Sequence, residues 1–126
     1  SHYQLARLLK DNGRLSDAIP HYQISIQSNP QYLFPRLELG MVEINSGQFD
    51  QAIENLEYAL TLQSGNKNPA VEASIYYGLS AAYANKKELQ KALSYANQAV
   101  DILPSYQPAQ EIRQRLLEAQ STAIIP

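Results

Sequence analysis

Apolar residues recur along the chain with the spacing of amphipathic helices, about 3.6 residues per turn. The pattern predicts seven helices, over residues 1–12, 16–29, 33–46, 50–63, 69–86, 89–103 and 107–121. Short polar segments such as Asn45-Ser46-Gly47-Gln48 separate them. Ser16, Asp50 and Asn68 are the expected N-caps, and Pro69 suits the first position of its helix. The chain is therefore predicted to be all-α.

The helices form units that repeat along the sequence. The interval from Ala18 to Ala52 equals one period of about 34 residues, and the interval from Ala52 to Ala92 is six longer. Small residues at these places allow the two helices of a hairpin to approach closely. The six additional residues before the third unit lie near Asn68 and Pro69, where a helix begins well. We expect them to lengthen helix 69–86 at its N-terminus, after a short loop at about 64–68.

Each unit carries the same series of residue types. The aligned pairs are Leu5-Ala6, Leu39-Gly40 and Leu79-Ser80, followed by Ala18-Ile19, Ala52-Ile53 and Ala92-Leu93, and two units close with Pro30 and Pro104. The pattern resembles the tetratricopeptide repeat, a helix–turn–helix unit that has this same period. The resemblance implies a right-handed helical solenoid of three repeats, at about 1–32, 33–66 and 69–106. Helix 107–121 would be the C-terminal cap, with Ala109, Ile112, Leu116 and Ala119 on its packing stripe.

We expect one domain over residues 1–126, and a fragment of a longer protein, because residue 1 falls inside a repeat. Two positions depart from the pattern. Lys87 stands where the other units have Gly13 and Gly47, so the third turn is expected to differ in shape. Glu43 stands where an apolar residue usually packs, so we expect it to lean out of the core or to find a partner.

Composition excludes several classes of function. Ten basic and 12 acidic residues give a net charge of −2, and only Lys86 and Lys87 are adjacent cations, so a nucleic-acid surface is not expected. The chain has no cysteine, no glycine-rich phosphate loop and no metal-binding histidine motif around His2 or His21. We therefore expect no catalytic, cofactor or metal site, and no enzyme activity. No apolar run is long enough for membrane insertion, and the compartment stays open.

The resemblance implies that the first helices of the repeats line a concave groove. The residues expected to face it are Tyr3, Arg7, Lys10, Phe34, Leu37, Met41, Ile44, Asn45, Ser74, Tyr77, Ala81 and Asn85. The middle of this groove is apolar, and a contiguous exposed apolar surface usually marks a partner site. The alternative is that the C-terminal helix or another repeat covers part of this stripe.

Similar repeats bind the acidic C-terminal tails of heat-shock chaperones through lysine, asparagine and arginine. Among the residues at the matching positions of this chain, only Arg7 could bind an acidic tail, and Glu38 would repel its carboxylates. We therefore expect a non-enzymatic interaction module that binds an apolar helix or extended segment of a protein partner, and not an acidic chaperone tail. The alternatives are an accessory or regulatory domain of a larger enzyme or secretion or assembly machine that packs intramolecularly, and homodimerisation through the same groove.

Overall fold

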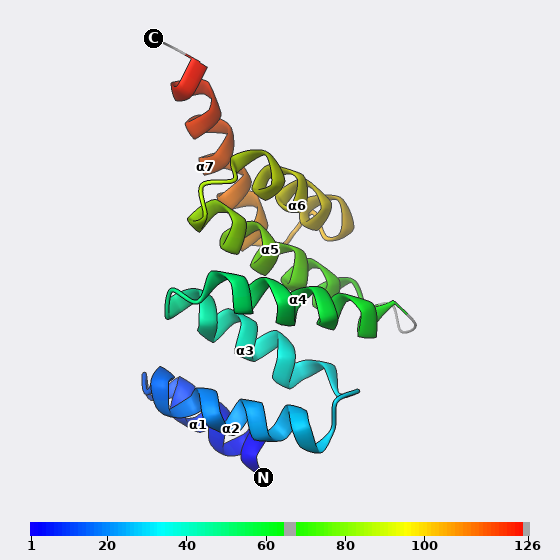
Figure 1. Ribbon diagram of the computed structural model, residues 1–126. Helices are drawn as coiled ribbons and strands as arrows, with labels where there is room; N and C mark the ends of the chain where they lie inside the picture. Colours follow the sequence, from blue (N-terminus) through cyan, green and yellow to red (C-terminus); the bar gives the residue numbers. More distant parts are fainter. Residues whose placement is uncertain (65–67, 125–126) are drawn as a thin grey trace.

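The computed structural model describes residues 1–64 and 68–124 and contains, in these ranges, seven helices and no strand (Figure 1). The helices are α1 (His2–Asp11), α2 (Leu15–Ser28), α3 (Leu33–Asn45), α4 (Phe49–Gln63), α5 (Pro69–Asn85), α6 (Leu89–Ile102) and α7 (Gln107–Ile124). Every predicted helix is present, and the all-α solenoid is confirmed.

Of the three residues expected to be N-caps, one caps its helix. Asn68 caps α5 as expected, because its Oδ1 accepts hydrogen bonds from the backbone N–H groups of Ala70 and Val71. The proposed caps Ser16 and Asp50 are wrong, since both lie inside helices that begin at Leu15 and Phe49. Four of the six additional residues lengthen α5 as expected, which has 17 residues against 13 in α3. The loop expected at 64–68 lies partly outside the described residues.

The helices pack as consecutive antiparallel hairpins stacked along one axis (Figure 1). The pairs are α1 with α2, α3 with α4, and α5 with α6, and α7 packs on α6 and α5. Neighbouring first helices touch each other, α3 with α5 and α5 with α7, whereas α2, α4 and α6 hardly touch one another. The stack therefore curves toward its first helices. We call the face formed by α1, α3, α5 and α7 the concave surface.

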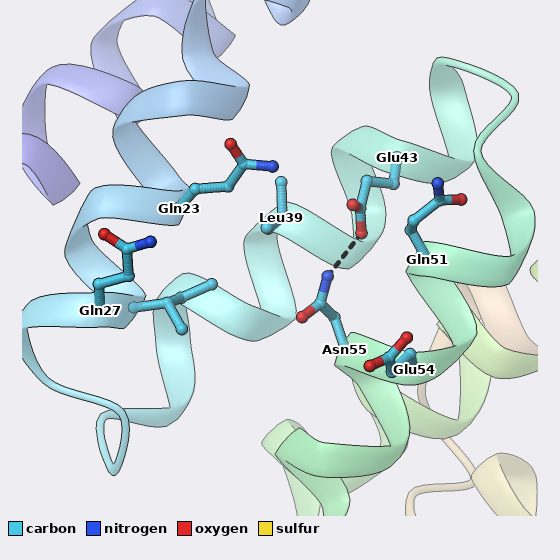
Figure 2. Close-up of a pocket in the computed structure, with 8 residues that line it drawn as sticks. Gln23, Gln27, Leu39, Glu43, Gln51, Glu54 and Asn55 are labelled. Carbon is cyan, nitrogen blue, oxygen red and sulfur yellow. Dashed lines mark hydrogen bonds between the residues drawn. The ribbon is translucent and has the colours of Figure 1, made fainter.

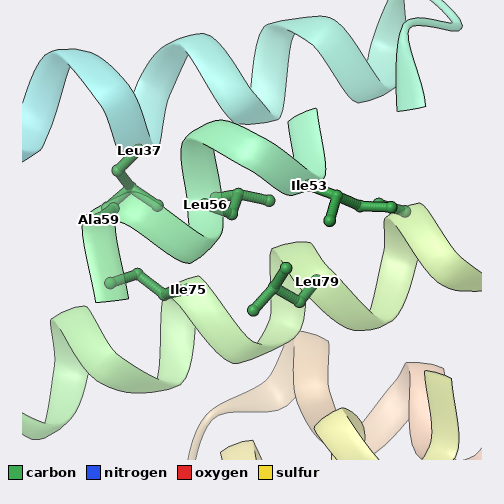
Figure 3. Packing of buried hydrophobic residues seen from close by; sticks show 7 residues of the cluster. Leu37, Ile53, Leu56, Ala59, Ile75 and Leu79 are labelled. Carbon is green, nitrogen blue, oxygen red and sulfur yellow. The ribbon is translucent and has the colours of Figure 1, made fainter. Parts of the chain in front are cut away.

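Leu56 of α4 occupies the centre of the largest apolar cluster, between α3 and α5 (Figure 3). Its side chain is fully buried against two glycines. A Cβ atom on Gly40 would lie 2.8 Å from Cγ of Leu56, and one on Gly78 would lie 2.9 Å from its Cδ1. Both distances are shorter than a carbon–carbon contact allows, so the two glycines permit the close approach of α3 and α5 to α4.

Helix α7 closes the apolar surface of the last hairpin. Ala109 packs with Ala73 and Ala99, and Leu116 packs with Ala92 and Ala96. Ile112 is half-buried beside the second of these clusters. Ala119, which we expected on the same stripe, is exposed. That expectation is wrong because the contact with α6 ends one turn earlier.

Glu43 is buried, with only 3% of its surface exposed. The expectation that it would lean outward is wrong, and the alternative expectation of a partner is correct. Nδ2 of Asn55 donates a hydrogen bond to its Oε1 at 2.7 Å. Burial raises the pKa of the Glu43 carboxyl, the Asn55 hydrogen bond opposes this rise, and the charge of Glu54 adds to it.

The three hairpin turns have the same shape, contrary to the expectation for Lys87. Gly13 and Gly47 have φ of 79°, and Lys87 has φ of 63°. In each turn the next backbone N–H donates to a carbonyl five residues earlier, as from Glu88 to Tyr83 at 3.0 Å. The flanking helices therefore impose the left-handed conformation on lysine, which costs about 1–2 kcal/mol relative to its favoured conformations.

Replacing this lysine tests the strain directly. We expect Lys87→Gly to raise the free energy of unfolding by about 0.5–1 kcal/mol, because glycine adopts the left-handed region freely but loses more backbone entropy on folding. Urea denaturation monitored by circular dichroism measures the change. The reciprocal variant Gly47→Lys is the control and is expected to lose stability. An equal loss in both variants would show that Lys87 is unstrained.

Candidate functional site

The concave surface has a narrower apolar stripe than the sequence predicted. Leu37 is a correction, because it is buried in the cluster around Leu56 and is not open to a ligand. Phe34 is 39% exposed. Met41 and Ile44 are half-buried against the same cluster, so each offers only part of its side chain.

The other predicted groove residues differ in how freely they can contact a ligand. Tyr77 and Ala81 are half-buried on α5, and Asn45 is exposed at the end of α3. Asn85 is exposed, but its Nδ2 donates to the carbonyl of Ala81 at 2.8 Å. Ser74 is likewise engaged, because its Oγ donates to the carbonyl of Ala70 at 2.9 Å.

A carboxylate organises the N-terminal end of the concave surface. Glu38 of α3 accepts hydrogen bonds from the hydroxyl groups of Tyr3 and Tyr22, the second at 3.0 Å. Nζ of Lys10 and Nε of Arg7 both lie 3.5 Å from Oε1 of Glu38. The side chain of Glu38 is 17% exposed, so these four groups surround a mostly buried charge.

The network changes the properties of its members. Burial raises the pKa values of the Tyr3 and Tyr22 hydroxyls well above that of free tyrosine, and the neighbouring Glu38 carboxylate raises them further. Arg7 and Lys10 are already paired with a negative charge, which lowers their attraction for a second carboxylate. From the sequence, Glu38 is expected only to repel the carboxylate of a ligand. The available signal was its place on the helix that follows Tyr3, Arg7 and Lys10 in the stack.

Two tyrosines outside the predicted set extend the aromatic surface. Tyr32 packs edge to face between Tyr3 and Phe34, with ring centroids 5.6 and 5.7 Å apart. Tyr106 packs edge to face on Tyr77 at 6.1 Å. Both follow a closing proline by two residues, at Pro30 and Pro104. This spacing could have identified them, because it places each tyrosine just before the start of a first helix.

The described residues hold no cluster of metal-binding side chains. No three histidine, cysteine, aspartate or glutamate side chains in this part of the chain could bind a metal ion together. The rings of His2 and His21 stack with centroids 5.2 Å apart, and their Nδ1 atoms lie 3.0 Å from each other. None of the described helices has the length and apolar character needed to cross a bilayer.

Comparison with known families agrees with the repeat pattern and the hairpin stack. The profile of the tetratricopeptide repeat matches residues 33–105. The chain belongs to the tetratricopeptide repeat family. Members of this family generally mediate protein–protein interactions and are typically not catalytic. No curated protein matches the chain significantly.

Solved structures of tetratricopeptide repeat (TPR) proteins share the fold. YrrB, a TPR protein with an unusual peptide-binding site, is 25% identical with a TM-score of 0.81, over 90% of this chain and 55% of its own. MamA is 22% identical with a TM-score of 0.78, over 92% of this chain and 64% of its own. The first TPR domain of Spaghetti (RPAP3), bound to the HSP90 peptide SRMEEVD, is 14% identical with a TM-score of 0.84 over 95% and 90%. This chain thus spans little more than half the length of YrrB.

Removing the charge of Glu38 tests the network. We expect Glu38→Gln to lower the free energy of unfolding by about 1–3 kcal/mol, because charge-assisted hydrogen bonds are lost around the buried Tyr22. We also expect the tyrosine ionisation seen by ultraviolet absorbance to begin at lower pH, since the carboxylate no longer opposes a second negative charge. The control Glu111→Gln alters an exposed side chain of α7. If the two variants behave alike, Glu38 does not hold the two hydroxyls.

Proposed function

We propose that this domain binds a segment of a partner protein on its concave surface. The observation that carries the proposal is the exposed aromatic edge formed by Tyr32 and Phe34, next to half-buried Met41 and Ile44. Large apolar side chains that stay exposed side by side usually mark a site for a partner. Solved structures of the same fold bind peptides, which supports a peptide segment as the ligand of this domain.

The chemistry of the surface favours an apolar helix or extended segment. Phe34, Met41, Ile44 and Tyr77 supply apolar area along α3 and α5. Arg7 and Lys10 share the carboxylate of Glu38, and Nζ of Lys10 also lies 3.9 Å from Oδ1 of Asp11, so the attraction of both cations for an acidic ligand is reduced. An acidic chaperone tail is therefore a poor fit, although a structural relative with 14% identity binds one.

The expected affinity is micromolar. Full burial of four large apolar side chains contributes at most roughly 6–12 kcal/mol, and these four are partly buried before binding. Association itself costs about 4–15 kcal/mol. The apolar area of the ligand adds to the favourable side. Since few unpaired charges take part, the affinity should depend weakly on salt.

A selection experiment tests this proposal. Random dodecapeptides displayed on phage would be selected on the wild-type domain, and the enriched peptides measured by fluorescence anisotropy. We expect apolar peptides with micromolar affinity, and a loss of roughly 10- to 100-fold with Phe34→Glu, because a buried phenyl ring contributes about 1.5–3 kcal/mol.

Ile24 provides a matched control, because it is 38% exposed on α2. Ile24→Glu should leave the affinity unchanged. Circular dichroism would verify that both variants stay folded. Enrichment of acidic peptides, or equal losses with the two variants, would contradict the proposed surface and its chemistry.

A second candidate is that the domain packs on a neighbouring helical repeat through α1. Leu5 and Leu8 are 40% and 58% exposed, whereas their equivalents in the second repeat, Leu39 and Val42, are 2% and 1% exposed. Leu39 and Val42 are covered by Tyr22 and the rest of the preceding hairpin. A helix equivalent to α2, from a neighbouring repeat, would cover Leu5 and Leu8 of α1 in the same way. This exposed apolar surface favours the accessory-domain alternative.

A tandem duplication tests this second candidate. A second copy of residues 1–34, placed directly before Ser1, keeps the repeat period, so the α2 copy should cover Leu5 and Leu8. We expect the free energy of unfolding to rise by about 2 kcal/mol or more, because the apolar contact between repeats is added. Replacing Leu5 and Leu8 by Glu at the new junction should remove the gain. No gain in the unmodified duplication would rule out this use of α1.

A further inference from the structure

A cleft lined by polar side chains and by Ile26 and Leu39 lies on the face opposite the concave surface, between α2 and α4. It has a volume of about 370 Å³. Helix α3 forms its floor, because α3 packs against both α2 and α4 while those two hardly touch. Gln23 reaches it from α2, Glu43 from α3, and Gln51, Glu54 and Asn55 from α4 (Figure 2). We call it the convex cleft.

Glu43 is the buried charge of the convex cleft. Figure 2 shows its carboxylate directed toward Asn55, which donates to Oε1 at 2.7 Å. Its Oε2 has no hydrogen-bond partner among the described residues. The one fully enclosed side-chain polar atom without a partner in residues 1–64 and 68–124 is Nε of Arg36. Oε2 of Glu43 is therefore not enclosed and remains accessible from the cleft.

The negative charges of the cleft have no cation of their own. In the described part of the chain, neither Glu43 nor Glu54 forms an ion pair with lysine or arginine. The guanidinium of Arg36 lies over the ring of Tyr58, with Cζ 3.9 Å from the ring centre, and its Nη1 donates to Oδ1 of Asn55 at 3.4 Å. A carboxylate buried without a counter-ion is costly, so a cation that entered would be stabilised.

In the third repeat, side chains fill the space that corresponds to the convex cleft. Aligning Ala92 with Ala52 places Tyr83 at the position of Glu43, Tyr95 at that of Asn55, and Lys91 at that of Gln51. The rings of Tyr83 and Tyr95 stack at 5.7 Å, and Nζ of Lys91 lies 5.2 Å from the centre of the Tyr83 ring. The third repeat thus supplies both filling side chains and a cation. The second repeat has an open space and a neutral glutamine instead.

We propose that the convex cleft binds the guanidinium group of an arginine side chain presented by a partner protein. Guanidinium carries five N–H donors in a planar fork, and the cleft offers several acceptors around it. These are the carboxylates of Glu43 and Glu54 and the amide oxygens of Gln23 and Gln51. The ammonium of lysine has three donors at one point and would satisfy fewer of them. This site is separate from the concave surface.

The test uses nuclear magnetic resonance of the 15N-labelled protein. The probe is the peptide acetyl-Gly-Gly-Arg-Gly-Gly-amide, and the reference replaces arginine by citrulline, which has nearly the same shape without the charge. We expect saturable shifts of the side-chain amide signals of Asn55, Gln23 and Gln51 with the arginine peptide, and at least tenfold weaker binding of the citrulline peptide. Equal binding of both peptides, or equal binding of a lysine peptide, would overturn the assignment.

Two variants test whether the arginine peptide binds in the convex cleft. Glu43→Gln should weaken binding of the arginine peptide at least tenfold, whereas Glu57→Gln, an exposed position of the same helix as Asn55, should leave it unchanged. Gln51→Lys imitates the third repeat by placing a cation in the cleft and should also weaken binding tenfold. If Glu43→Gln does not fold, Gln51→Lys alone tests whether the arginine peptide binds in the convex cleft. Unchanged binding in Gln51→Lys, or shifts confined to the concave surface, would overturn the proposal.

Discussion

The packing of Leu56 between two glycines is the constraint on which the rest of the structure depends. Gly40 and Gly78 leave room for this side chain from opposite sides, so α3 and α5 both approach α4 more closely than any side chain at those positions would allow. The same approach brings Cε of Met41 to 2.9 Å from where a Cβ on Gly78 would lie. One leucine therefore fixes the junction of the second and third repeats. The position of α3 relative to α5 determines which apolar residues of the concave surface stay accessible.

This junction gives the two faces of the stack different properties. On the concave side α3 and α5 contact each other, and Phe34 stays exposed near the start of α3. On the opposite side α2 and α4 stay apart, and the space between them must be filled by side chains or left open. The third repeat fills the corresponding space with Tyr83 and Tyr95, whereas the second places Glu43 and Asn55 there. The cleft therefore follows from a change of residue type within a repeated backbone.

Helix periodicity and the small residues at repeated spacing sufficed to predict the seven helices, their pairing and the longer α5. They could not predict side-chain depth, because depth depends on the neighbouring helix. Leu37 was assigned to an open groove, yet it belongs to the cluster against which Val71, in the added turn of α5, also packs. Lys87 was expected to alter its turn, but the hydrogen bonds from both flanking helices impose the shape formed by Gly13 and Gly47. In both cases tertiary contacts outweigh a local preference.

The two glutamates of α3 show most clearly what sequence alone left out. Glu38 and Glu43 are five residues apart, so they point about 140° apart around the helix, toward opposite faces of the stack. Glu38 meets two tyrosine hydroxyls and two cations, and its charge is compensated. Glu43 accepts a hydrogen bond from the side-chain amide of Asn55, and its charge is not compensated by a cation that the structure describes. This difference in charge compensation is the reason why we propose an apolar segment as the ligand of the concave surface and an arginine side chain as the ligand of the convex cleft.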